Sequence, residues 1–471
     1  MKTLLIVPPL LMEERYNEYS SAAGTSPPLG LGYIAAVLKK GGHQVNIIDG
    51  LIENLTLNQL MDRIKKYNPD VIGLALNLIN YNNTLKLGSL IKEINKDIKI
   101  VAGGPHVSTD PLGSLKDSPF DFGVYGEGEY TYLELIDALE KNKNLDNIRG
   151  LVHKKNHKVI KNLPRALIQN LDEIPFPARE LFVPLKNYKL SIFYYKRSPV
   201  TTQMTSRGCP FKCIFCDHNV FGHTFRGHSP EYVVDEMELL KDKYKMKEIM
   251  FYDDTFTLNK KRALDICDEI IKRKLDILWS IGARIDTVDK NLLSKMKKAG
   301  CWNIGYGIET GNPEVMKFIK KGIDLPQVEK VVKESVNMGI EVRGLFMLGH
   351  PTETKKTLRD TIEFAKSLPL HSVNFSITYP LIGTELYDIA DQYGYFNKEK
   401  LEEFIGHPSD PIFVPHGLTK KDLLDAQRKG YLEFYLNPIR ILRILKKINS
   451  LEDIKKYSRG FSVVIKLLTK K

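Results

Sequence analysis

The sequence predicts an α/β protein with two successive units: an N-terminal doubly wound, Rossmann-like parallel sheet and then a partial (β/α)6 barrel, followed by a helical, basic C-terminal segment. Three observations predict this class. Short apolar runs alternate with amphipathic helical patterns, a second such series begins near residue 200, and basic and aliphatic residues dominate the end of the chain. A chain of 471 residues exceeds one ordinary core. We therefore expect an N-terminal domain over 1–145, a linker over 146–190, the barrel over 191–395 and a helical region over 396–471.

The N-terminal domain has five β-rich runs, at 3–9, 44–49, 70–76, 99–104 and 122–129. Helical patterns separate them, so the strands should be parallel and a ligand should bind at their C-terminal ends. Glycine, proline or charged residues stand at the C-terminal ends of four of these runs, at 8–9, 49–50, 103–106 and 126–129. Glycine lets a backbone approach a bulky ligand closely. The pattern favours a ligand site at this edge.

The barrel begins after a connector. Residues 146–190 combine a hairpin-like alternation with the proline-containing stretch "LDEIPFPAREL", which cannot continue a helix. Six strands are then expected at 201–206, 248–254, 277–284, 303–310, 342–349 and 373–380. Six units rather than eight predict an open barrel with its active site at the C-terminal ends of the strands.

Three of the five cysteines follow the first barrel strand, in the spacing Cys209-x3-Cys213-x2-Cys216. A structural zinc site needs four ligands, which His218 or His223 could complete. Three thiolates on one loop, with no second pair elsewhere, fit better a 4Fe–4S cluster that keeps one iron open. The N-terminus lacks the features of a signal peptide, so we expect a cytoplasmic protein, in which clustered thiols indicate metal or catalysis.

The other candidate ligands have ordinary explanations. Cys267 shares a helical face with apolar residues and Cys301 begins a strand, so both are expected to be buried in the core. His106 and His350, like the two histidines near the cysteine cluster, border the predicted sites and are expected to be polar lining rather than proton-transfer groups.

"CPFKCIFC" resembles the signature of the radical S-adenosylmethionine (SAM) superfamily, and further motifs follow in order: "FYDDTFT" (251–257), "GYGIETG" (305–311), "GLFMLGHPTET" (344–354) and "YPLIGTELYD" (379–388). The resemblance covers about 190–390. It implies a 4Fe–4S cluster on the three cysteines. It also implies that Asp253 or Asp254 contacts the methionyl ammonium group of SAM and that Glu309 faces its ribose.

The N-terminal half resembles the cobalamin-binding radical SAM proteins, the class B radical methylases, through "PPLGLGYIAAVLKKGGHQVNIID", "AGGPHVSTDP", "VYGEGE" and "IPFPAREL". The resemblance implies cobalamin, which we place at Gly103, Gly104, His106, Gly126, Glu127 and Gly128. The Asp-x-His-x-x-Gly element of other cobalamin domains is missing, and residues 8–30 contain no histidine. The cobalt would then have no protein imidazole below it.

The resemblance implies an enzyme that cleaves SAM to a 5′-deoxyadenosyl radical and, with methylcobalamin, methylates an unactivated carbon. Flavodoxin or ferredoxin would donate the electron. One alternative is a radical cyclase or rearrangement enzyme of the same architecture without net methyl transfer. Another is a non-catalytic corrinoid or redox sensor, which is disfavoured because the SAM motifs are present. A methylthiotransferase is also disfavoured, because no cysteine precedes Cys209.

The net charge of +12 is concentrated at the C-terminus: residues 428–471 hold twelve Lys or Arg against three acids, 12 − 3 = +9. Residues 437–448 predict a basic amphipathic helix. Such a helix can contact an anionic membrane, which would suit a lipid or other hydrophobic small-molecule substrate, or it can pack its apolar face on the barrel. Nucleic acid is not expected, because aromatic and basic residues are not interleaved.

Overall fold

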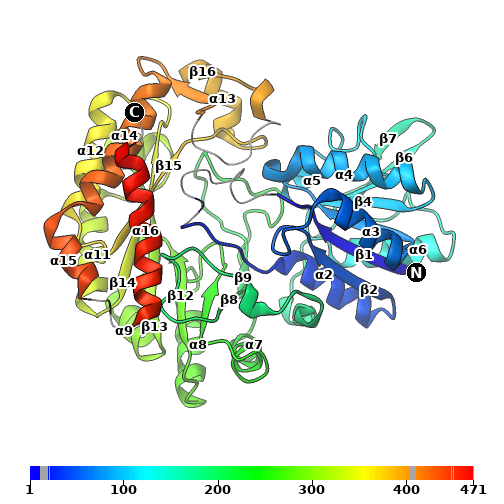
Figure 1. Ribbon diagram of the computed structural model, residues 1–471, viewed down its shortest axis with the longest axis horizontal. Helices are drawn as coiled ribbons and strands as arrows, with labels where there is room; N and C mark the ends of the chain where they lie inside the picture. Colours follow the sequence, from blue (N-terminus) through cyan, green and yellow to red (C-terminus); the bar gives the residue numbers. More distant parts are fainter. Residues whose placement is uncertain (11–19, 21, 402–409, 447, 449, 470–471) are drawn as a thin grey trace.

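A computed structural model describes residues 1–10, 20, 22–401, 410–446, 448 and 450–469. Part of the histidine-free stretch 8–30, and Lys447 of the predicted basic helix, lie outside these residues. Figure 1 shows the N-terminal unit (blue to cyan) beside the barrel (green to yellow), with the C-terminal helices (orange to red) on the barrel. None of the described helices has the length and apolar character needed to span a bilayer.

The N-terminal sheet has the strand order β2-β1-β3-β4-β5-β6-β7. Its parallel strands are β1 (Lys2–Val7), β2 (Gln44–Asp49), β3 (Val71–Ala75), β4 (Lys99–Gly103) and β5 (Phe122–Val124). The main helices are α2 (Leu29–Lys40), α3 (Leu57–Tyr67), α4 (Tyr81–Ile94), the short α5 (Pro105–Thr109) and α6 (Glu129–Glu140). The direction in which successive strands are added to the sheet reverses between β1 and β3, and in doubly wound sheets a ligand binds at this switch point. The predicted sheet and its ligand-binding edge therefore agree with the topology.

The hairpin β6 (Leu151–Lys155) and β7 (Lys158–Lys161) extends this sheet in the antiparallel sense. Residues predicted as linker thus continue the N-terminal sheet. The segment after it is held by short 3-10 turns at Leu171–Glu173, Arg179–Leu181 and Leu185–Asn187. Phe182, Leu185 and Tyr188 of this segment belong to a buried apolar cluster shared with both units. The two units therefore have a continuous core.

The barrel sheet has the order β15-β14-β13-β12-β11-β8, and all its pairings are parallel. The strands are β8 (Val200–Gln203), β11 (Glu248–Phe251), β12 (Leu278–Ala283), β13 (Cys301–Glu309), β14 (Glu341–Leu348) and β15 (Ser372–Ile377). The helices are α7 (Pro230–Asp242), α8 (Lys260–Lys272), α9 (Lys290–Lys298), α10 (Pro313–Phe318), α11 (Leu325–Asn337) and α12 (Lys355–Ser367). β8 and β15 do not pair, so the six-stranded barrel is open, as predicted.

The C-terminal region consists of α13 (Glu385–Tyr393), the hairpin β16 (Gly394–Phe396) and β17 (Phe413–Pro415), α14 (Lys420–Tyr435), α15 (Pro438–Leu445) and α16 (Leu451–Thr469). α14 covers the free edge of β15. Gln427 Nε2 donates to Phe375 O at 2.7 Å, the Phe375 amide donates to Tyr431 Oη at 3.1 Å, and the Val373 amide donates to Tyr435 Oη at 3.1 Å. Side chains of α14 thus form hydrogen bonds with the backbone groups of β15 that an additional strand would otherwise pair with.

α16 lies across the open side of the barrel. Val463 and Leu467 pack with Ile192 of the segment that leads into β8. At the helix end, Arg428 of α14 donates from Nε to Leu467 O at 2.6 Å. α16 therefore contacts elements next to both edge strands.

Candidate active site

The cysteine loop leaves the barrel between two short antiparallel strands, β9 (Ser206–Arg207) and β10 (Arg226–Gly227). Gly208 opens the loop with φ +86°, and a Cβ there would lie 2.2 Å from Thr224 O, so only glycine fits. Cys209 and Cys216 are partly exposed and Cys213 is buried. The structure therefore places all three predicted thiols on one loop at the C-terminal end of the first barrel strand.

Positive charge surrounds Cys213. Arg284 Nη1 lies 3.6 Å from its sulfur, and the guanidinium is held over the Phe211 ring at 3.5 Å. A hydrogen bond from the Cys216 thiol, with help from Lys321 and Arg284, lowers the pKa of Cys213 to about 6 although burial opposes it. Thiolates are the form that binds metal. The chemistry of this loop fits an anionic, thiolate-held cluster.

Asp253 and Asp254 follow β11 but have different surroundings. Asp253 is partly buried and accepts hydrogen bonds from the Thr205 amide and the Ser206 hydroxyl, both at 2.6 Å. It therefore fixes the backbone that leads into the cysteine loop. Asp254 is exposed, and its carboxylate accepts from the Gly208 amide at 2.8 Å. Of the two, Asp254 has the carboxylate that is available to a ligand.

Glu309 ends β13 in a left-handed conformation, with φ +70°. A bulge interrupts the β13–β14 register there, and the buried carboxylate binds Lys321 Nζ at 2.7 Å. A Cβ at Gly307 would lie 2.6 Å from Glu309 Oε1, so this glycine makes room for the carboxylate. Strained backbone of this kind is found at functional sites, where the surrounding structure holds it.

The predicted cobalamin residues lie at the C-terminal edge of the N-terminal sheet. Gly104 has φ +118° and a Cβ there would lie 2.8 Å from Leu76 O, whereas one on Gly126, at φ +74°, would meet open space. Gly103 ends β4, and Gly128 precedes α6. His106 lies in α5 beside the Tyr81 ring, at 4.6 Å between ring centres, and burial lowers its pKa. Tightly packed backbone at Gly104, next to open space at Gly126, leaves room for a large flat ligand at this edge.

Glu127, between these glycines, has another role. Its carboxylate accepts from Arg207 Nη1 at 2.9 Å and from Arg226 Nη1 at 2.8 Å, while Glu129 accepts from Arg207 Nη2 at 2.6 Å. All four side chains are buried. Glu127 is one of the residues predicted to border cobalamin, but its carboxylate is committed to the two arginines that flank the cysteine loop.

A second contact joins the two units. Thr109, at the end of α5, donates to Asp217 Oδ2 at 3.1 Å, and Asp217 directly follows Cys216. A Cβ at Gly383, in the loop after β15, would lie 2.7 Å from Thr109 Cγ2. The cysteine loop is therefore fixed to both glycine-rich loops of the N-terminal sheet.

A cavity of about 1670 Å³ extends between the two units and into the barrel. Val7, the last residue of β1, and Asn77, just after β3, line it on the N-terminal side, at the switch point of the sheet. Tyr252 and Ile377 line it at the C-terminal ends of β11 and β15, and residues of α15 and α16 form an outer wall. No sequence pattern predicts this wall, because it is built from residues that are distant along the chain.

The structure argues against a single zinc ion. In a tetrahedral site with Zn–S bonds of 2.3 Å, sulfur atoms are about 3.8 Å apart. The described residues offer just one set of three donors within 4.8 Å of one another, and it does not include the cysteines. The rings of His218 and His223 instead contact each other, tilted by 31°, with 4.0 Å between their centres. Cys267 and Cys301 are buried in the core, as expected.

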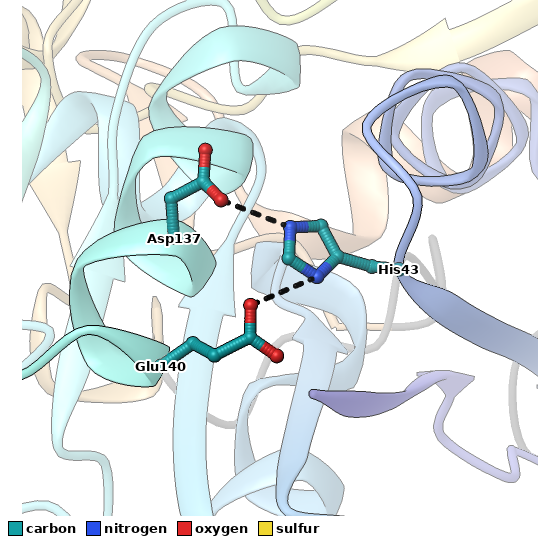
Figure 2. Close-up of side chains that lie close together, drawn as sticks. All are labelled: His43, Asp137 and Glu140. Atoms are coloured by element: carbon teal, nitrogen blue, oxygen red, sulfur yellow. Dashed lines mark ion pairs between the residues drawn. The ribbon is translucent and has the colours of Figure 1, made fainter.

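That set of three donors comprises His43, Asp137 and Glu140 (Figure 2). Asp137 lies 3.3 Å from His43 Nε2, whereas Glu140 lies 4.0 Å from Nδ1 on the other side of the ring. Glu140 also binds the N-terminal ammonium group at 2.6 Å. Because the carboxylates approach different ring nitrogens, the arrangement suits a histidine held between two acidic side chains better than a metal ion.

Comparisons with known proteins agree with this geometry. The family model "Radical SAM superfamily" matches residues 204–365, and the model "B12 binding domain" matches residues 19–136. An uncharacterized methyltransferase of Pyrococcus horikoshii, PH0819, is 39% identical over 93% of this chain and 93% of its own length. The chain belongs to the cobalamin-binding radical SAM family. It is therefore a radical SAM enzyme, and the alternative of a non-catalytic sensor has no support.

More distant members of this family have different named activities. An anaerobic magnesium-protoporphyrin IX monomethyl ester cyclase of Rubrivivax gelatinosus is 27% identical over 88% of this chain and 75% of the cyclase. The solved structure of OxsB, with aqua-cobalamin bound, has a TM-score of 0.76 at 20% identity and covers 98% of this chain and 72% of OxsB. TsrM from Kitasatospora setae, with cobalamin and a [4Fe-4S] cluster bound, gives 0.65 at 20% identity, over 83% and 75%. The two structures share the fold.

Proposed function

We propose that the enzyme methylates an unactivated carbon of a small molecule held in the cavity between its two units. The observation that carries this proposal is the attachment of the cysteine loop to both glycine-rich loops, through Arg207–Glu127 and Thr109–Asp217. These contacts hold the candidate cluster site against the candidate cobalamin site. A substrate between the two sites can then meet a radical and a methyl donor in turn.

The proposed site residues follow the geometry. Cys209, Cys213 and Cys216 hold the cluster, Asp254 and Glu309 bind SAM, Asp253 positions the loop, and Gly103, Gly104, His106, Gly126, Glu127 and Gly128 border cobalamin, Glu127 through its backbone. When bound, these groups supply one-electron cleavage of SAM and a carrier for the methyl group. The protein contributes orientation, and Arg284 and Lys321 contribute positive charge beside Cys213. A flavodoxin or ferredoxin is the proposed electron donor.

The test begins with cofactor content. After anaerobic reconstitution with iron, sulfide and hydroxocobalamin, we expect about four irons and one cobalt per chain. Cys213→Ala should lose iron and keep cobalt, whereas Cys267→Ala, a matched thiol in the barrel core, should keep both. Iron without retained cobalt in the wild type would overturn the methylation proposal and leave the radical barrel intact.

Ring formation is the second candidate, because a cyclase is among the relatives. The two reactions differ in their SAM products. Methylation consumes one SAM for the radical and one to renew the methyl carrier, so it yields 5′-deoxyadenosine and S-adenosylhomocysteine in equal amounts. Cyclisation yields 5′-deoxyadenosine without S-adenosylhomocysteine. Measuring both products during turnover distinguishes them.

We also propose that α15 and α16 place the enzyme on an anionic membrane. Seven apolar side chains of these helices are at least 45% exposed: Ile439, Leu442, Leu445, Ile454, Phe461, Ile465 and Leu468. On α16 their spacing of 7, 4 and 3 residues confines them to an arc of about 60°. Exposed cations such as Arg443, Lys455 and Lys466 accompany them. Apolar area and positive charge together favour an anionic surface.

Vesicle sedimentation tests this placement. Phosphatidylglycerol vesicles should bind the enzyme and phosphatidylcholine vesicles should not. Leu442→Ser combined with Phe461→Ser should abolish binding. Leu163→Ser is the matched control, because Leu163 is 67% exposed but lies in the N-terminal unit. Equal sedimentation of wild type and double variant would contradict the proposal.

A further inference from the structure

The cavity forms a long channel between the barrel and α16. On the barrel side every residue from 371 to 377 lines it, and on the helix side its lining residues lie between 453 and 467. At about 3.3 Å per strand residue and about 1.5 Å per helix residue, both walls are about 20 Å long. The hydrocarbon layer of one bilayer leaflet, half of the full core, is about 15 Å thick. The channel is therefore long enough for one extended lipid chain.

Aromatic and aliphatic side chains form the middle of the channel. Four aromatic rings follow one another along the barrel wall, with successive centres 6.0, 6.5 and 5.6 Å apart: Phe193, Tyr435, Tyr431 and Phe375. Four lining residues of α16 share one helical face, because they are three or four residues apart: Tyr457, Gly460, Val464 and Leu467. An apolar chain is stabilised when it leaves water for walls of this kind.

The channel is positively charged near the N-terminal ends of the barrel strands. Four exposed cations line it: Lys196 and Arg197, which precede β8, Lys247, which precedes β11, and Lys446, which follows α15. Arg197 lies 4.0 Å from Asp276, whereas the three lysines form no ion pair with the described residues. Glu341 and Asp453 are the acids among the described lining residues. This end of the channel therefore favours an anionic head group.

The channel opens on the surface that we propose to touch the membrane. Leu445, Ile454 and Phe461 line the channel, and each of them is more than half exposed. All three belong to the seven exposed apolar side chains of α15 and α16. Because the rim is apolar, a lipid chain can pass from the bilayer into the channel without crossing water.

We propose that the substrate is an anionic membrane lipid with one long apolar chain, which enters the channel between α15 and α16. Its head group stays near the lysines of the rim, and its chain extends toward Tyr252 and Ile377, at the edge of the barrel that carries the cysteine loop. The carbons presented there belong to an alkyl chain, so they are of the unactivated kind that the proposed reaction modifies. This inference rests on the proposed function, since it assumes that the cavity is the substrate site.

The experiment measures chain-length dependence on the reconstituted full-length enzyme, without vesicles. Octanoate, dodecanoate and hexadecanoate are titrated calorimetrically below their micelle concentrations. We expect one site per chain, and a gain in affinity of about tenfold or more at each step, because each step buries four further methylenes. Hexadecanol should bind about threefold more weakly than hexadecanoate. Lys196→Gln combined with Lys247→Gln and Lys446→Gln should remove that difference.

Val464→Trp tests the channel itself. Val464 lines the channel toward the C-terminal end of α16, so the larger indole should shorten the space for the chain. Hexadecanoate should lose about tenfold or more in affinity, and octanoate should bind unchanged. Ile465→Trp is the matched control, because Ile465 is the next residue but is 45% exposed and lies outside the channel lining. It should change neither affinity.

Hexadecanoate that binds no more tightly than octanoate, or a chain-length preference that Val464→Trp leaves unchanged, would overturn the inference. Equal affinities of hexadecanoate and hexadecanol would refute the anionic head group. Should Val464→Trp fail to fold, the chain-length series of the wild type decides. Iron, cobalt and substrate-free SAM cleavage, measured on the same samples, report separately on the proposed function.

Discussion

Arg207 Nη1 lies 2.9 Å from Glu127 Oε1, and this buried contact joins two motifs that are 80 residues apart along the chain. Arg207 stands two residues before the first cysteine of the cluster motif, and Glu127 lies in the glycine-rich loop after β5. A residue beside each of the two candidate cofactor sites is thus bonded to one beside the other. A displacement of one loop should therefore displace the other.

Glu127→Gln is expected to destabilise the protein strongly. The substitution leaves Arg207 and Arg226 buried with one carboxylate fewer, and removing one partner of a buried ion pair costs about 3–5 kcal/mol. Chemical unfolding followed by circular dichroism measures the loss. Glu134→Gln is the control, because Glu134 forms an exposed ion pair with Arg165 and should change stability by about 0.5 kcal/mol or less. If Glu127→Gln unfolded at the same midpoint as wild type, the contacts of Glu127 with Arg207 and Arg226 would contribute little to stability.

Asp254→Asn and Asp253→Asn should have different effects. Asp254 has an exposed carboxylate, so Asp254→Asn should weaken SAM binding about tenfold or more and leave iron content unchanged. Asp253 holds Thr205 and Ser206, so Asp253→Asn should lower iron content by loosening the loop. Equilibrium dialysis with SAM and iron analysis on each variant test this. Unchanged SAM binding by Asp254→Asn would reject its proposed role.

Gly307→Ala should weaken SAM binding although residue 307 need not touch the ligand. A methyl group there would lie 2.6 Å from Glu309 Oε1 and 2.9 Å from Lys321 Nζ, so it must displace one of them. Calorimetric titration should show the same direction of change as Glu309→Gln. Gly282→Ala, at a barrel-strand glycine with open space around the added methyl, serves as control. Normal SAM affinity in Gly307→Ala would mean that the carboxylate position is not critical.

Glu248 should make the stability depend on pH. Burial raises the pKa of this carboxyl to about 7, although the amides of Lys196 and Arg197 and the indole of Trp302 donate to it. The native carboxyl keeps its proton at pH values where the unfolded chain has lost it. The unfolded state then binds fewer protons, so this group lowers the free energy of unfolding as pH rises from about 4.5 to 7, by about 3 kcal/mol.

The measurement compares wild type with Glu248→Gln across that range. The difference in their free energies of unfolding should change with pH, because glutamine does not titrate. Other buried acids contribute equally to both proteins and cancel in the difference. A difference that stays constant between pH 4.5 and 7 would show that Glu248 is ionised in the folded protein throughout.

Much of this architecture was predictable because it depends on patterns within short stretches of the sequence. The composition of runs such as 44–49 and 99–104 predicts strands, and the spacing of the cysteines predicts the loop that carries them. The pairing of Arg207 with Glu127 joins segments that are distant along the chain, so the periodicity of a single helix or strand could not predict it. The helix expected at 437–448 is α15, but its place beside the cavity depends on how it packs on the barrel, which its own sequence does not indicate.

The hydrogen bonds from α14 to β15 have a consequence for the behaviour of the protein in solution. An edge strand with free amides is a template onto which another chain can add, and such addition begins aggregation. Gln427, Tyr431 and Tyr435 occupy that template. A chain cut before Lys420 would expose the backbone of Val373 and Phe375 even if the barrel stayed folded. Preparations trimmed to the two family domains should therefore be prone to precipitation, and α14 is best kept in any shortened version.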